Sequence, residues 1–267
     1  MTETTEAPQA AIFHLLKPAA SCAFDDAYVK QYLAKWDMLK HTRFLHFRYT
    51  KAYHKMASDE FLIDFFNDPN VQKALEVLQP KGEWQPVAGK VKSVSSSVVK
   101  ASMTRMDIFD KLEDAEPSII RGASSSIMKC MEEVVDGFTV SDTLREMLVK
   151  GEESENYGLF SDEERAEFLY LVFKHISLGG AMNQYEDEIE PYLDISKRIY
   201  KEMLSVQKDP ISGKVAIASP LFSVKGVDAE GGWSLFPVAS ENSFAYISMD
   251  PQRRTCKLWY HAFLPYW

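Results

Sequence analysis

The sequence is short of the features that mark several large classes of protein. Its 267 residues include only three cysteines, Cys22, Cys130 and Cys256, which are far apart and odd in number. This usage predicts packed thiols in a reducing compartment rather than disulfides or metal ligands. No apolar run approaches the ~20 residues needed to span a bilayer, and the acidic N-terminus lacks the pattern of a signal or transit peptide. We therefore expect a cytosolic protein with no membrane insertion.

Positive charge is also scarce. The chain has 30 Lys and Arg against 39 Asp and Glu, for a formal net charge of −9. No run of basic residues is long enough to form an obvious patch. This balance argues against non-specific attraction to nucleic acid or to an anionic membrane, so we expect no nucleic-acid partner.

The common catalytic motifs fail on spacing. Between Gly82 and Gly89-Lys90 there are six residues rather than the four of a phosphate loop, and Val91 stands where a metal-binding Ser or Thr is required. The glycine fingerprint of dinucleotide-binding folds is missing. The serines that follow Gly122 lack the second glycine of a nucleophile elbow. These failures predict a protein that is not an enzyme and binds no cofactor.

Histidines and acidic residues suggest no metal site either. His41, His46 and His54 have neither the spacing of a zinc motif nor a nearby cysteine pair. The acidic run Glu186 to Glu190 lacks calcium-loop spacing, and we interpret it as stabilising a helix start. His175, at the end of a predicted helix, is the strongest catalytic candidate. A lone histidine there is more often structural, and catalysis is the alternative.

Hydrophobic patterning predicts an α+β fold. We expect a disordered tail over residues 1–10 and a single domain over residues 11–267, with a helical middle, containing a central helical hairpin, packed on an antiparallel sheet from N- and C-terminal strands. The serine-rich stretch at Ser95 is interpreted as a strand edge or loop, with phosphorylation as the alternative. The main predicted strands are Ala11–Leu16, His41–Tyr49, Lys90–Ala101, Val215–Ala218, Leu221–Val227, Phe244–Met249 and Cys256–Phe263.

The helical hairpin is the clearest local prediction. Ser161 and Glu164 have the spacing of a capping box at the start of one helix, and Gly179-Gly180 ends it. A second helix is expected over Asn183–Gln207, with Pro191 marking either a kink or its true first turn. Two further helices are predicted. One covers Ser124–Val135, with Ile127, Met131 and Val134 on its buried face, and the other runs from Asp68-Pro69 through Leu78.

Aromatic residues make up 12% of the chain and crowd its C-terminus. Tyr260, Phe263, Tyr266 and Trp267 fit a buried sheet as well as a protein interface, and both interpretations stay open.

The helical hairpin also carries a resemblance. The string EFLYLVFKHISLGGAMNQYED from Glu167, continued by PYLDISKRIYKEMLSVQKDP, resembles the cilia- and flagella-associated protein 300 family. Further matches follow in order, including KWDML, DEFLIDFFNDPNV, SDTLRE, DPQRR and LWYHAF. They cover roughly Asp25 to Phe263.

The resemblance implies a role in assembling ciliary dynein arms, with no catalytic residue. It implies a protein of the cytoplasm and the cilium whose partners are axonemal dynein arm subunits and a kintoun-type assembly factor with co-chaperones. The intraflagellar transport machinery is a further implied partner. A structural protein of the axoneme is the alternative, as is an enzyme built around His175.

We place the predicted partner-binding surface at the hairpin junction, with the turn near residue 253 as a second contact. The residues of this prediction are His175, Gly179, Gly180, Gln184, Tyr185, Glu186, Asp187, Arg253 and Arg254.

Overall fold

A six-stranded antiparallel sheet lies at the centre of the computed structural model, which describes residues 11–19, 21–116, 118–121, 124–208, 211 and 213–265. The strand order is β1-β2-β14-β13-β12-β5. The strands are β1 (Phe13–Leu15), β2 (Thr42–Tyr49), β5 (Val91–Val98), β12 (Leu221–Ala229), β13 (Phe244–Asp250) and β14 (Thr255–His261). The predicted α+β fold, with a sheet built from both ends of the chain, is confirmed. The predicted disordered tail lies outside the described residues.

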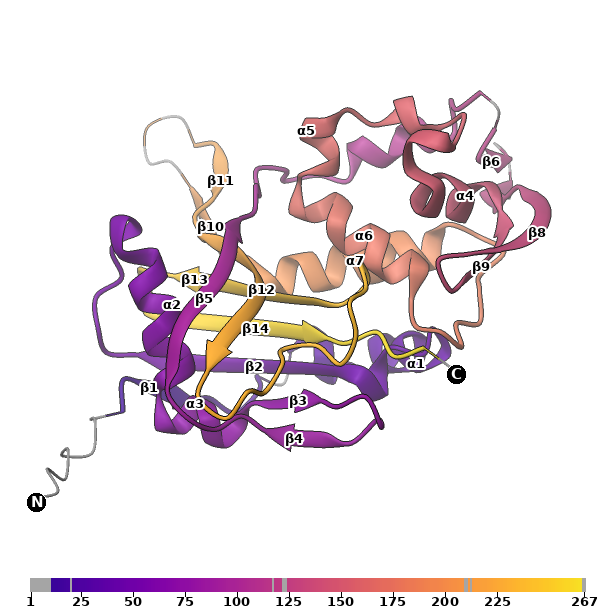
Figure 1. The fold of residues 1–267 in the computed structure, drawn as a ribbon. Helices are drawn as coiled ribbons and strands as arrows, with labels where there is room; N and C mark the ends of the chain where they lie inside the picture. Colours follow the sequence, from indigo (N-terminus) through magenta and orange to yellow (C-terminus); the bar gives the residue numbers. More distant parts are fainter. Residues whose placement is uncertain are drawn as a thin grey trace, which may run out of the picture.

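Helices cover both faces of the sheet (Figure 1). The core on one face includes residues of α1 (Ala27–Lys35), α4 (Thr143–Lys150), α6 (Phe168–Leu178) and α7 (Glu190–Met203). The core on the other face includes α2 (Ser58–Asn67), α3 (Pro69–Ala74) and the ribbon of β3 (Glu76–Leu78) and β4 (Trp84–Pro86). Both cores share one sheet; the single-domain organisation stays a prediction.

Strand β13 shows why the sheet is buried on both sides. Phe244 and Tyr246 belong to the core with α6 and α7, whereas Ala245 and Ile247 belong to the core with α2 and α3. Successive side chains of a strand point to opposite faces, so an unbroken apolar run indicates two covered faces. This run identifies the strand as central.

Besides the β3–β4 ribbon, three short ribbons of the described chain lie outside the main sheet. They are β6 (Ile120–Arg121) with β7 (Ser126–Ile127), β8 (Lys129–Val135) with β9 (Phe138–Asp142), and β10 (Val206–Lys208) with β11 (Val215–Ile217). The prediction of a helix over Ser124–Val135 is therefore wrong. Two of its supposed core residues, Met131 and Val134, are 88% and 69% exposed. The turn at Asp136-Gly137, with both residues at positive φ, joins β8 to β9 as a hairpin.

The predicted capping box at Ser161 and Glu164 is confirmed, but the helix that it starts is only α5 (Asp162–Arg165). The chain is extended at Glu167 and helical again from Phe168, because Phe168 N donates to Lys100 O at 2.7 Å. The Glu167 carboxylate, fully buried, accepts from Ser102 N and Oγ and pairs with Lys100. A crossing segment thus divides the predicted helix in two.

The second hairpin helix is shorter than predicted. It runs from Glu190 to Met203, and Pro191 stands in its first turn, which decides between the two interpretations of that proline. The predicted helix after Asp68 ends at Ala74, where the backbone becomes extended and forms β3. Asp68 caps that helix with one carboxylate oxygen and accepts Ile12 N and Phe13 N with the other, which ties α3 to β1.

Candidate functional site

The junction between α6 and α7, residues 179–189, is fixed against the C-terminal end of α1. Gly180 N donates to Trp36 O at 2.8 Å, and Gln184 N donates to Lys35 O at 3.0 Å. Met182 N donates to the Asp37 carboxylate at 3.0 Å. Three hydrogen bonds to three consecutive residues give this loop a defined backbone path.

The glycine pair permits this close approach. Gly179 caps α6 at φ +63, and a Cβ atom at that position would lie 2.7 Å from Trp36 O. A Cβ on Gly180 would overlap the backbone of Asp37. The predicted helix stop at these glycines is confirmed, and they have a second role as the point where α6 meets α1.

A buried ion pair lies beneath the junction. The side chains of Asp142 and Arg145 are 0% and 1% exposed, and they form an ion pair and hydrogen bond. Arg145 also donates to the Tyr192 hydroxyl at 2.5 Å, and its guanidinium lies 3.4 Å from the centre of the Tyr185 ring. Burial raises the pKa of Tyr192 to about 12, so the tyrosine remains neutral. Sequence reasoning placed Tyr185 at the junction but missed Arg145, because no motif marks it.

Glu186 connects this buried cluster to α1. Its carboxylate lies 2.7 Å from Lys35 Nζ and accepts Trp36 Nε1 at 2.9 Å, and its backbone N donates to Tyr192 Oη at 2.9 Å. The rings of Trp36 and Tyr192 stack at 4.8 Å. The interpretation of Glu186 and Asp187 as stabilising a helix start is wrong, because α7 begins at Glu190. Glu186 instead holds two helices together.

His175 is a structural residue of α6. Its two ring nitrogens lie 2.8 Å from Asn242 Oδ1 and 2.9 Å from Tyr246 Oη, and its ring packs against that of Phe244 at a tilt, with 4.1 Å between the ring centres. The Asn242 amide in turn donates to Gly179 O. Burial lowers the pKa of His175 to about 3, so the ring is neutral rather than a cation at the helix end. With both nitrogens engaged and only 4% of its surface exposed, His175 does not present a catalytic group to solvent.

The exposed part of the junction is small. The predicted contact residues Gln184 and Asp187 are exposed, as is the neighbouring Glu188, and Met182 is 52% exposed. Asp187 pairs with Lys129 at 2.7 Å, and this hydrogen bond holds the pKa of its carboxyl below the ordinary value. Of the predicted contact residues here, these two polar side chains are the ones that a partner would meet first.

Arg253 and Arg254 do not join this surface. They lie in the turn between β13 and β14, whereas the junction lies by Asn242, at the start of β13 (Figure 1). A strand of this length spans about 20 Å. Both arginines are exposed, and Asp250 fixes the turn by accepting the backbone N of Arg253 at 2.9 Å. The predicted site is thus two separate surfaces, at opposite ends of one strand.

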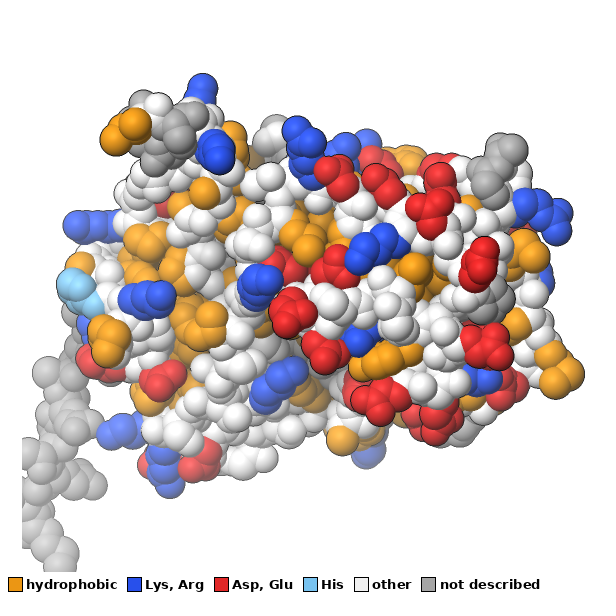
Figure 2. Space-filling view, turned by 90° about the horizontal axis from the view of Figure 1, so that it is seen from above, with side chains coloured by type: hydrophobic (Ala, Val, Ile, Leu, Met, Phe, Trp, Pro, Cys, Tyr) orange, Lys and Arg blue, Asp and Glu red, His pale blue; other side chains and the backbone are white. Residues whose placement is uncertain are grey.

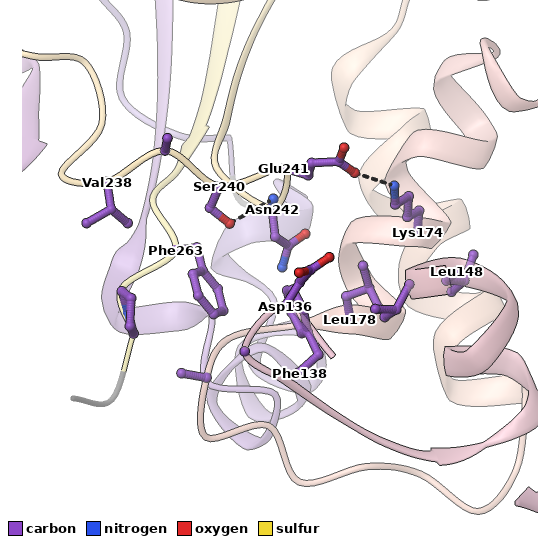
Figure 3. Close-up of a pocket in the computed structure, with 15 residues that line it drawn as sticks. Asp136, Phe138, Leu148, Lys174, Leu178, Val238, Ser240, Glu241, Asn242 and Phe263 are labelled. Atoms are coloured by element: carbon purple, nitrogen blue, oxygen red, sulfur yellow. Dashed lines mark hydrogen bonds and ion pairs between the residues drawn. The ribbon is translucent and has the colours of Figure 1, made fainter. Parts of the chain in front are cut away.

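A hollow of about 450 Å³ opens beside the junction (Figure 3). Leu178, Asn242 and Phe263 line it, and an ion pair of 3.1 Å between Lys174 and Glu241 crosses its edge. The sequence did not predict this hollow, whose lining comes from segments more than a hundred residues apart. Two aromatic residues singled out at the C-terminus, Tyr266 and Trp267, lie outside the described residues.

The described residues contain no group of three or more His, Cys, Asp or Glu side chains placed to hold a metal ion. Within the same part of the chain, no helix has the length and apolar character to cross a membrane. All three cysteines are free, and Cys22 and Cys256 are buried. Burial raises the pKa of the Cys22 thiol.

The fold and the junction define an α+β protein in which a short polar loop is held by a buried ion pair and by the end of a neighbouring helix. The chain matches the family described as "Cilia- and flagella-associated protein 300" over residues 10–261. The chain therefore belongs to the cilia- and flagella-associated protein 300 family.

Two relatives carry the same name. A protein from Chlamydomonas reinhardtii is 45% identical over 249 residues, which cover 93% of this chain and 96% of the relative. A protein from Paramecium tetraurelia is 26% identical over 243 residues, which cover 91% of this chain and 90% of the relative. No solved structure matches.

Proposed function

We propose that this protein is a non-enzymatic adaptor for the cytoplasmic preassembly and ciliary delivery of outer and inner axonemal dynein arms. Its family is associated by name with cilia and flagella. The proposed partners are dynein arm subunits, a kintoun-type assembly factor with its co-chaperones, and the intraflagellar transport machinery. Each would bind by protein–protein contact.

One observation carries the proposal: the junction exposes Gln184 and Asp187 on a backbone that the buried Asp142–Arg145 pair and α1 hold in place. Binding residues are commonly found on loops that a rigid scaffold positions. A fixed loop loses little conformational entropy when a partner binds. Such a surface suits recognition of another protein.

The test separates surface from scaffold. Reversing the charge of Glu186 would release Lys35 and Trp36 and so disturb the fold. We therefore choose the double variant Gln184→Arg/Asp187→Lys for a crosslinking pull-down from the cytoplasm of a ciliated cell. We expect at least a fivefold loss of recovered dynein arm subunits and assembly factors, measured by quantitative mass spectrometry.

Glu83→Lys is the control, an exposed acidic residue of the β3–β4 turn on the other side of the sheet. It should leave recovery unchanged, and thermal unfolding should show that both variants fold. Full recovery with the folded double variant would remove the junction as the binding surface. Salt-resistant retention of the protein on doublets, with little cytoplasmic pool, would favour a structural protein of the axoneme instead.

A further inference from the structure

The β10–β11 hairpin stands away from the body of the molecule and carries an apolar face (Figure 1). Val206 lies opposite Ile217, and Lys208 lies opposite Val215. Directly opposed residues, and residues two apart, share one face of a ribbon. Val206, Val215 and Ile217 therefore lie on the same face, with Lys208 at its outer end, and Val206 and Val215 are 64% and 50% exposed.

This face forms one wall of a pocket of about 620 Å³, a volume within the range of about 300–1,000 Å³ typical of ligand sites. The other walls are the end of α7 and the segment 103–107, which Tyr200 holds by donating to Met103 O at 2.8 Å. Leu169 and Leu204 line it and are almost fully buried. Met103 and Met106 add flexible side chains that adapt to the shape of an apolar partner.

The rim of the pocket is basic, although the whole chain is acidic. Lys197 and Lys201, one turn apart on α7, are exposed and form no ion pair among the described residues. Arg105 and Asp107 also line the pocket and form an ion pair of 3.7 Å, so the positive charge of the rim comes from the two lysines.

The acidic residues of α7 near these lysines already have partners. Asp194 pairs with Arg198 and Glu202 pairs with Lys257, each at 2.9 Å. They therefore do not neutralise the rim. Figure 2 shows the side of the molecule on which the hairpin stands. Apolar side chains gather on the half that carries the hairpin, and acidic side chains gather on the other half.

We propose that this pocket is a docking site for an amphipathic helix from another protein, with apolar anchors on one face and Asp or Glu beside them. The apolar walls would accept the anchors, and Lys197 and Lys201 would pair with acidic residues one turn apart on the helix. The charge of the rim selects an acidic helix over a basic one. This site lies apart from the α6–α7 junction, and the proposal does not depend on the role given to that junction.

The test uses two labelled peptides and the full chain. Both are amphipathic 15-residue helices with leucine on one face; the other face carries glutamate in the first peptide and lysine in the second. Fluorescence anisotropy should show that the acidic peptide binds at least tenfold more tightly than the basic one. Its affinity should fall with added salt, since exposed charges are screened.

Variants locate the binding. Lys197→Glu/Lys201→Glu should weaken the acidic peptide about tenfold, the effect of replacing two rim attractions by repulsions. Val215→Asp should weaken both peptides, since it places a charge on the apolar wall. The matched control Lys73→Glu/Lys81→Glu makes the same change in net charge at exposed lysines of α3 and the β3–β4 turn and should leave the affinity unchanged.

Three results would overturn the proposal: equal affinity for the two peptides, an unchanged affinity in the folded Lys197→Glu/Lys201→Glu variant, or the same loss in the control. Binding of anionic lipid vesicles in place of the acidic peptide would also overturn it, because the rim would then recognise a membrane surface. If the acidic peptide fails to bind while dynein arm subunits are still recovered, the proposal for this pocket fails and the proposed function is unaffected.

Discussion

Replacing Arg145 by methionine should be among the most damaging single changes in this protein. The substitution keeps the aliphatic length of the side chain but removes the guanidinium that pairs with Asp142, whose side chain is fully buried. A buried carboxylate left without its partner costs about 3–5 kcal/mol. Domains of this kind are stable by about 5–15 kcal/mol, so Arg145→Met should remove a large part of the free energy of unfolding.

A substitution of Asp142, the ion-pair partner of Arg145, tests the effect of the negative charge alone. The Asp142 carboxylate also caps α4 by accepting Arg145 N at 2.8 Å. Asp142→Asn retains an oxygen for that hydrogen bond and removes only the negative charge. The double variant Asp142→Asn/Arg145→Met leaves neither charge of the pair buried. Its loss of stability should therefore be smaller than the sum of the two single losses by at least about 2 kcal/mol.

Urea unfolding followed by circular dichroism measures all four proteins at pH 7. The slope of free energy against urea should be similar in each, which shows that the unfolded states are comparable. If the two single losses add to within about 0.5 kcal/mol, the pair is not coupled and the reasoning is wrong. A double variant that loses the full sum of the two single losses would likewise show that Asp142 and Arg145 are not coupled.

Two further predictions concern the glycine pair and the buried histidines. Gly180→Ala, which places a methyl group on the backbone of Asp37, should cost about 1–3 kcal/mol in urea unfolding, whereas Gly158→Ala, which meets nothing within 4 Å, should be nearly neutral. Burial lowers the pKa of His175 and of His261 to about 3, against about 6.5 in an unfolded chain, so their contribution to stability is complete above pH 6.5 and is lost as the pH falls toward 3. Each contributes a slope of ~1.4 kcal/mol per pH unit. His175→Gln should remove one such slope between pH 6 and 4, and an unchanged slope would contradict its neutral burial.

The sheet was predictable because its strands carry local signals. The unbroken apolar run of β13 and the turn at Asp250-Pro251 mark a hairpin, and both strands form as expected. The helix expected over Ser124–Val135 failed because three apolar residues at helical spacing outweighed Asp136-Gly137, a strong signal for a β-hairpin.

The candidate site was predictable only in outline. Gly179-Gly180 and the polar string after them indicated a helix junction, which the structure contains. The roles of Glu186 and His175 depend on Lys35, Asn242 and other residues far away in the sequence. Periodicity and capping describe neighbours along the chain, so they could not assign these contacts.

The strand order has a consequence for how the protein is made. Strands β13 and β14, which come last in the chain, lie in the middle of the sheet between β12 and β2. During synthesis β2 and β12 each expose an unpaired edge, and the two halves of the sheet join only when the final hairpin has left the ribosome. A frameshift or stop codon that removes residues after 243 would therefore delete the centre of the sheet rather than its rim. Such late truncations should be as harmful to the accumulation of this protein in the cell as early ones.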